Sequence, residues 1–248
     1  MRKRWFSIVG LAVVSIIIIS GGLFIFYSGT QNNHIPDRDT LFQIEAFNTV
    51  SSGKYDGYMP YSELKEHGDF GIGTFHKLDG EMICLNGVFY QISIDGKPRQ
   101  VDPSIKAPYA TITFFEADIT KTLEKSVDYF EIQNIIQSLM PTENAIYAIK
   151  ISGTCTYAET RSVPAQNKPY PTLAEVVENQ SIFVLTNVSA TAVGFWFPSS
   201  MDGVDYAGYH LHLITDDHSA GGHLLDFTIE NATIEIDQTN KFDLILLP

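Results

Sequence analysis

Four of the seven histidines in this chain lie within twenty residues, in the segment GYHLHLITDDHSAGGHLLDF that runs from Gly208 to Phe227. His210 and His212 are two positions apart, so on a β-strand both side chains point to the same face. His223 follows after a polar, glycine-rich stretch (215–222) that is typical of a turn and can return the chain beside the pair. We therefore expect these three histidines to lie close together.

Three neutral imidazoles can provide three of the four tetrahedral ligands of Zn²⁺, and the open fourth position distinguishes catalytic zinc sites from structural ones. The segment therefore predicts a zinc site with His210, His212 and His223 as metal ligands. His218 lies within the turn, where we expect an exposed side chain. The alternative explanation is that the three histidines are merely exposed residues of a strand beside a loop.

The elements that must position these histidines are mostly strands. Between Glu81 and Val101, strand-like runs are separated by Asn86-Gly87 and Asp95-Gly96, the dipeptides most typical of tight turns. Helical spacing predicts one longer helix within 119–140, and Thr172 with Glu175 predicts a capping box at a second, shorter helix. We expect an α+β, β-dominated fold of two mixed or antiparallel sheet domains with a few short helices. The predicted domains are an N-terminal β-rich one (34–141) and a C-terminal metal-binding one (142–248).

The N-terminus resembles an export segment. Three basic residues at positions 2–4 precede an uncharged run from Trp5 to Tyr27, which as a helix could cross the roughly 30 Å of a bilayer core. Residues 1–33 are therefore predicted to be a signal peptide or membrane anchor with its linker. A retained anchor would hold the protein at the extracytoplasmic face of the membrane, and a cleaved signal would release it, so both alternatives predict export.

Charge limits the classes of ligand. The formal net charge is −13, and no basic cluster follows the first four residues, which disfavours nucleic-acid binding. An acidic protein repels anions at long range, so any site for an anionic substrate needs a local cation.

Two cysteines, Cys84 and Cys155, lie in apolar, strand-like runs of the part expected to be exported. They could form one disulfide in an oxidising compartment, or remain two buried thiols. No Cys-x-x-Cys spacing supports thiolate zinc or redox chemistry.

Two segments resemble the α-acetolactate decarboxylase family: the stretch from YDGYMPYSELKEHGDFGIGTFHKLDGEMICLNG to PYATITFF, and the histidine segment itself. The match extends from about Thr40 to the end of the sequence. The resemblance implies a two-domain α+β fold, often dimeric, with zinc as cofactor. It also implies non-oxidative decarboxylation of the small-molecule substrate 2-acetolactate to acetoin and CO2.

Transferred residue by residue, the family's zinc ligands correspond to the three histidines already singled out. Its metal-side acid corresponds to Glu81 in DGE, and its substrate-binding arginine to Arg161 in ETRSVP. We also expect Thr74 of GTF to line the site. Family members continue beyond the segment KFDLILLP into a tail with a further glutamate, for which we expect no counterpart in this sequence.

The implied reaction requires these residue types. Loss of CO2 leaves an enediolate, whose negative charge a Lewis-acidic metal stabilises where it develops. Glu81 would protonate the enediolate carbon as a general acid, and Arg161 would bind the substrate carboxylate or the enediolate. Without this function, Glu81 would be a solvated turn residue and Arg161 a surface ion-pair partner.

Two other functions compete with the decarboxylase. An exported, membrane-tethered β-module could bind zinc or a ligand without catalysis, and would need neither Glu81 nor Arg161. A cupin-like oxygenase also begins with His-x-His, but it requires a glutamate ligand shortly afterwards. Here Thr215, Asp216 and Asp217 follow the pair, which disfavours this alternative.

Overall fold

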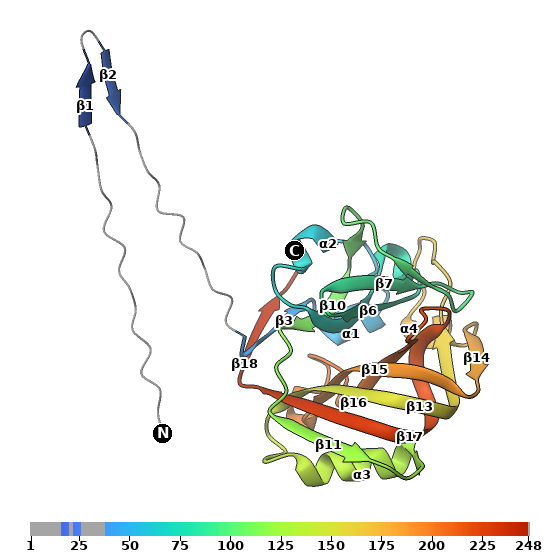
Figure 1. Cartoon of the computed structure of the whole chain (residues 1–248). Coiled ribbons are helices and arrows are strands. Elements are labelled where there is room, and N and C mark those ends of the chain that lie inside the picture. Colours follow the sequence, from blue (N-terminus) through green and yellow to red (C-terminus); the bar gives the residue numbers. More distant parts are fainter. Residues whose placement is uncertain (1–15, 20–21, 26–37, 248) are drawn as a thin grey trace, which may run out of the picture. The chain divides into compact units, whose positions relative to one another are not determined.

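Two seven-stranded β-sheets dominate the structure (Figure 1). The computed structural model describes residues 16–19, 22–25 and 38–247, and residues Asp37–Pro248 form one compact unit. Within this unit, strands far outnumber the short helices, so the predicted β-dominated α+β class is confirmed.

The first sheet has the strand order β18-β3-β10-β5-β6-β7-β8. All neighbouring pairs are antiparallel except β18 with β3, which are parallel. Its strands are β3 (Thr40–Ile44), β5 (Phe70–Thr74), β6 (Glu81–Leu85), β7 (Val88–Ile92), β8 (Pro98–Gln100), β10 (Tyr109–Thr113) and β18 (Lys241–Ile245).

The second sheet is antiparallel and has the order β11-β17-β16-β15-β13-β14. The long strand β17 also pairs with β12 and with β13. Its strands are β11 (Ile119–Leu123), β12 (Val127–Asp128), β13 (Ile146–Ser162), β14 (Ser181–Leu185), β15 (Val188–Phe197), β16 (Gly208–Thr215) and β17 (Gly221–Thr239). A separate small pair joins β4 (Met59–Pro60) to β9 (Lys106–Ala107).

The helices are short: α1 (Phe47–Ser51), α2 (Tyr61–Leu64), α3 (Tyr129–Leu139) and α4 (Leu173–Val177), with 3-10 turns at His76–Leu78 and Ser199–Met201. The predicted longer helix exists as α3, and the capping box of Thr172 and Glu175 begins α4. The side chain of Asp128 caps α3 by accepting the backbone N–H of Glu131 at 2.8 Å, so the helix begins at residue 129. Residues 119–123, which we expected within the helical region, form strand β11 instead.

The strands are not divided between the two sheets at residue 141. β11, β12 and α3 precede this position but belong with the second sheet, whereas the last strand, β18, returns to the first sheet beside β3. The observed division therefore differs from the expected boundary between 34–141 and 142–248.

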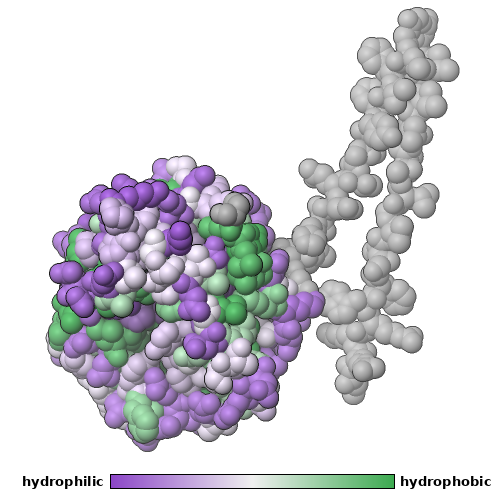
Figure 2. All heavy atoms as spheres, turned by 180° about the vertical axis from the view of Figure 1, so that it is seen from behind, coloured by the Kyte–Doolittle hydropathy of each residue, from purple (hydrophilic) through white to green (hydrophobic). Residues whose placement is uncertain are grey.

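The two sheets share a buried apolar core. Leu41, Phe70, Ile72, Ile83 and Ile92 of the first sheet form one cluster with Ile146, Ala148, Val193, Phe195, Phe197 and Ile214 of the second. Burying side chains of this size stabilises a fold by roughly 1.5–3 kcal/mol each. Figure 2 shows that apolar residues also gather in patches between polar ones on the surface of the molecule. Cys84 and Cys155 are both buried and free, so the two-thiol alternative holds.

The N-terminal unit is described only where Ile16–Ile19 (β1) pairs antiparallel with Gly22–Ile25 (β2). Most of the predicted signal or anchor segment, 1–33, lies outside the described residues. Among those that are described, no helix is long and apolar enough to cross a membrane.

Asp237 on β17 makes stability depend on pH. Burial raises the pKa of its carboxyl group from 3.8 to about 6, although it accepts the Glu116 N–H at 3.0 Å. Because the folded-state pKa is raised, the proton stabilises the fold fully below about pH 4, and this contribution is lost as the pH rises through 6. Asp237→Asn stays neutral, so between pH 4 and 7 it should gain roughly 1–3 kcal/mol relative to wild type. Urea unfolding of both proteins at several pH values measures this difference.

The control is Asp102→Asn, at an exposed carboxyl group whose pKa the Ser104 hydroxyl and N–H lower. It should show no such gain. Equal pH dependence of Asp237→Asn and wild type would contradict the assignment to Asp237.

Candidate metal centre and active site

The histidine segment folds as a hairpin in which β16 and β17 pair over only three positions. His212 lies opposite His223, followed by Leu213 opposite Gly222 and Ile214 opposite Gly221. Beyond His212 the two strands separate, since β16 continues along β15 and β17 continues along β13. The histidines therefore lie where the strands separate, and the separation leaves room for a pocket.

Gly222 permits the tight junction at this point. Its φ is +143°, and a Cβ at this position would lie 2.4 Å from the carbonyl oxygen of Arg161 on β13. A side chain cannot fit there without moving backbone, so glycine is required for β17 to pair with β13 and β16 together.

The three histidines meet as predicted. The ring centroids lie 5.2 Å apart for His210–His212 and His210–His223, and 5.3 Å for His212–His223. One nitrogen from each ring lies within 4.8 Å of the others, a spacing suited to a shared metal ion. His218, in contrast, is exposed in the turn, and its ring packs against Tyr90 at a tilt of 42°.

The hydrogen bonding of these rings fits a metal ion. The Nδ1 of His212 lies 2.8 Å from the carbonyl oxygen of Met82 and donates to it, which leaves the lone pair of its buried Nε2 without a hydrogen-bond partner. The buried Nδ1 atoms of His210 and His223 also lack partners. Burial lowers the pKa of His212 and of His223 well below 6.5, so both rings are neutral, the form that binds metal. For His212 and His223, an unpartnered buried nitrogen on a neutral ring is what metal binding requires.

Glu81 and Arg161 reach the same place from opposite sheets. Glu81 begins β6 on the first sheet, and Arg161 lies on β13, directly opposite His223. Arg161 Nη1 lies 3.2 Å from Glu81 Oε1, and Glu81 Oε2 lies 3.5 Å from His212 Nε2. Both side chains are largely buried, so Glu81 is not a solvated turn residue and Arg161 is not a surface ion-pair partner.

The environment of Glu81 favours its neutral form. Burial raises the pKa of its carboxyl group, although the positive charge of Arg161 acts in the opposite direction. Thr74, the cross-strand neighbour of Glu81 on β5, is buried and donates to the carbonyl oxygen of Gly80 at 2.7 Å. Thr74 thus lines the site as expected and also supports the turn before Glu81.

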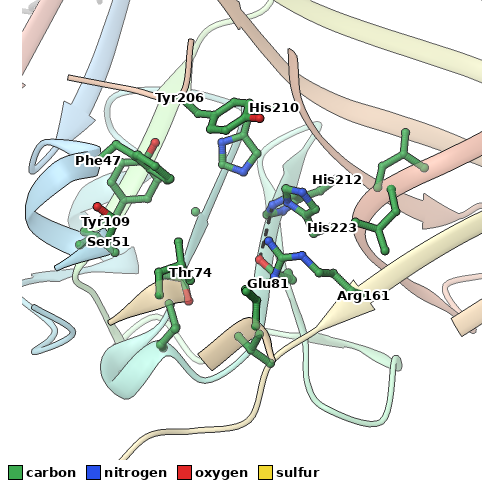
Figure 3. Close-up of a pocket in the computed structure, with 18 of the residues that line it drawn as sticks. Phe47, Ser51, Thr74, Glu81, Tyr109, Arg161, Tyr206, His210, His212 and His223 are labelled. Atoms are coloured by element: carbon green, nitrogen blue, oxygen red, sulfur yellow. Dashed lines mark hydrogen bonds and ion pairs between the residues drawn. The ribbon is translucent and has the colours of Figure 1, made fainter. Parts of the chain in front are cut away.

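All six predicted site residues line one pocket of about 750 Å³ (Figure 3). Its polar end carries the histidines, Glu81 and Arg161, and the opposite wall is mainly aromatic and aliphatic. Figure 3 shows Phe47 and Tyr109 across the pocket from Glu81 and Arg161, whereas Tyr206 lies beside His210, with ring centroids 6.0 Å apart. The sequence alone did not single out these three residues. Phe47 begins helix α1, whose five residues are too few to show helical periodicity in the sequence.

Known proteins were compared with the chain. Residues 41–247 match the family model described as Alpha-acetolactate decarboxylase. The chain belongs to this family. The alpha-acetolactate decarboxylase of Methanosarcina mazei is 47% identical over 215 residues, covering 85% of this chain and 75% of that protein. The Bacillus subtilis protein of the same name is 38% identical over 206 residues, covering 83% and 81% respectively.

Solved structures agree with this family membership. The crystal structure of acetolactate decarboxylase from Bacillus subtilis subspecies spizizenii matches with a TM-score of 0.82 at 38% identity, covering 84% of this chain and 89% of that one. A Staphylococcus aureus protein described as similar to alpha-acetolactate decarboxylase matches with a TM-score of 0.81 at 32% identity, covering 84% and 89%. The prediction that this chain is a member of the acetolactate decarboxylase enzymes is therefore confirmed.

The requirement for Gly222 is testable by Gly222→Ala. The added methyl group must displace the backbone of β13 or β17, so the variant should lose more than about 2 kcal/mol of stability. Urea unfolding curves measure this loss.

Gly87→Ala is the matched control, because Gly87 also has a positive φ (+75°) but the nearest atom to its added Cβ is 3.9 Å away. It should lose only about 1–2 kcal/mol. Equal losses in both variants would contradict the close approach at Gly222.

Proposed function

We propose that this protein decarboxylates 2-acetolactate to acetoin and CO2 with a zinc ion held by His210, His212 and His223. One observation carries the proposal: three imidazoles, with one nitrogen of each within 4.8 Å of the others, share a pocket with a carboxyl group and a guanidinium group. Membership of the acetolactate decarboxylase family supports the choice of substrate and reaction.

The donor set favours zinc among common metals. Three imidazoles with no thiolate suit zinc and other borderline divalent ions, whereas magnesium and calcium prefer oxygen ligands. Bound there, zinc would act as a Lewis acid toward the hydroxyl and carbonyl oxygens of the substrate as negative charge develops.

Arg161 provides the cation that an acidic protein needs for an anionic substrate. Its guanidinium group is planar and always charged, and it is held at the pocket wall by Glu81. We assign Arg161 to binding the substrate carboxylate or the enediolate that remains after CO2 leaves. The fixed geometry limits the entropy cost of orienting the substrate.

Glu81 is placed to move a proton. Its carboxyl group lies between Arg161 and His212, so a substrate bound in this part of the pocket would meet it directly. We assign Glu81 to protonation of the enediolate carbon, the step that completes acetoin. The apolar wall opposite, including Phe47 and Val163, would keep bulk water from this carbon.

A zinc-binding or ligand-binding β-module without catalysis is not favoured. Such a module needs the histidines but has no use for a buried carboxyl–guanidinium pair beside them. Here Glu81 and Arg161 are buried against the histidines in the same pocket. Burying such a pair costs desolvation free energy, and a role in catalysis accounts for this cost.

Assembly and location are further parts of the proposal. We propose a homodimer, as the resemblance implies, and export through residues 1–33, whose basic start and uncharged run support it. Light scattering that gives the mass of one chain would contradict the dimer. Recovery of the protein only from the cytoplasm would contradict export.

Removal of metal should abolish the reaction. Dialysis against a chelator should eliminate acetoin formation from racemic acetolactate, and one equivalent of zinc per chain should restore it, because the imidazole nitrogens have no other partner. Colorimetric detection of acetoin measures the rate. Full activity in protein shown to be metal-free would contradict the proposal.

Glu81→Gln tests the proton donor. The amide keeps the size of the side chain but cannot donate an acidic proton, so turnover should fall by roughly 10²-fold or more while zinc stays bound. Glu143→Gln, at an exposed glutamate that does not line the pocket, is the control and should keep wild-type turnover. Unchanged turnover in Glu81→Gln would remove Glu81 from the mechanism.

A further inference from the structure

Asp205 is a buried carboxylate that neither the expected site nor the proposed reaction uses. Its side chain is 1% exposed, in the loop that precedes β16. One carboxylate oxygen, Oδ2, accepts the Thr111 hydroxyl at 2.9 Å, and the other, Oδ1, accepts the backbone N–H of Tyr206 at 2.6 Å. The Tyr109 hydroxyl also donates to this carboxylate. All these donors are neutral, so the carboxylate is held firmly without any cation among them.

The loop that carries Asp205 is itself fixed to the first sheet and helix α1. The carbonyl oxygen of Val204 accepts the Gln43 side-chain amide at 2.7 Å and the Phe47 N–H at 2.9 Å. Thr111, which binds the carboxylate, lies on β10 of the same sheet. The position of Asp205 is therefore set before it meets any residue of the metal centre.

His210 is the one cationic or potentially cationic partner of Asp205 in the part of the chain that the structure describes. His210 Nδ1 lies 4.0 Å from Asp205 Oδ1. This nitrogen is buried and has no hydrogen-bond partner. A short approach of the ring would satisfy an unpartnered donor and an unpaired carboxylate together.

His212 shows the effect of a hydrogen bond from the Nδ1–H of a histidine in this site. Its Nδ1–H is taken up by the Met82 carbonyl oxygen, so its Nε2 is directed to the shared centre. His210 on the same face of β16 has no carbonyl oxygen in this position, and Asp205 takes its place. Metal-binding histidines almost always donate the second ring N–H to a carboxylate or carbonyl oxygen, which fixes the ring and raises its basicity.

We propose that Asp205 is a positioning residue for the metal centre: it accepts the Nδ1–H of His210 and so presents His210 Nε2 to the metal. This inference rests on the proposed zinc site, and it adds a residue that the sequence resemblance does not assign. If Asp205 has this role, β10 and the loop before β16 also help to hold the metal centre in place, because they fix the Asp205 carboxylate.

The direct test is the state of the His210 ring in the zinc-loaded full-length protein. Nuclear magnetic resonance of ¹⁵N-labelled histidines distinguishes a metal-bound nitrogen from one that carries a proton. The expected spectrum shows His210 bound through Nε2, with a proton on Nδ1 that exchanges slowly with water. Binding through Nδ1 would overturn the inference while the zinc site stood. Histidine ¹⁵N chemical shifts that do not change when zinc is added would overturn both this inference and the proposed function.

Variants of Asp205 test its effect on the metal. Asp205→Ala should weaken zinc binding by about 10–100-fold in competition with a chromophoric chelator, and should alter the visible spectrum of the cobalt(II)-loaded protein. Asp205→Asn can still accept the Nδ1–H through its amide oxygen, so its zinc affinity should lie between those of wild type and Asp205→Ala.

Asp237→Asn is the matched control, because Asp237 is also buried and also accepts a backbone N–H, but does not contact a histidine. Its zinc affinity and cobalt spectrum should equal those of wild type. Wild-type zinc affinity in Asp205→Ala would overturn the inference. If Asp205→Ala does not fold, Asp205→Asn and the spectrum of His210 decide the question. Asp205→Asn with wild-type affinity and an unprotected Nδ1 proton on His210 would also overturn it.

Discussion

The cross-strand pair of His212 and His223 is the constraint on which the site depends. It lies at the last paired position of β16 and β17, after which the two strands follow different neighbours. Pairing sets the two imidazoles side by side, and separation of the strands opens the space that they face. His210 joins them only because it is two residues away on the same strand face. One strand separation thus creates the donor set and the pocket together.

The grouping of these side chains also determines the electrostatics of the pocket. The imidazole nitrogens of His210, His212 and His223, packed beside the carboxyl group of Glu81, form a place where a cation is favourable, and Arg161 adds a fixed positive charge to it. The rest of the chain is strongly acidic, with a formal net charge of −13. An anionic substrate is therefore attracted locally at a site whose surroundings repel it, so affinity must come from contacts inside the pocket rather than from steering at long range.

The parts of this site that could be predicted from the sequence are those set by the spacing of residues within a short segment. The period-2 spacing of His210 and His212, and the turn before His223, determine strand faces over a few residues. Pairing between distant strands has no such local signal. The return of β18 to the first sheet, and the burial of Glu81 after a turn that would otherwise be solvated, depend on tertiary contacts.

The aromatic side of the pocket and the loop beside His210 could not be predicted for a related reason. Phe47 belongs to a helix of five residues, too short for helical periodicity to show. Tyr206 and Asp205 lie in a loop whose place is set by hydrogen bonds to β3, α1 and β10. The resemblance to acetolactate decarboxylases identified Glu81 and Arg161, which spacing alone would have left as ordinary surface residues.

The central claim is that one zinc ion binds to all three imidazoles at once. X-ray absorption of the zinc-loaded protein measures this directly. The account predicts three histidine nitrogens at about 2.0–2.1 Å, with the remaining position filled by oxygen. A first shell with fewer than three imidazole nitrogens, or protein that retains no zinc after gel filtration, would contradict it.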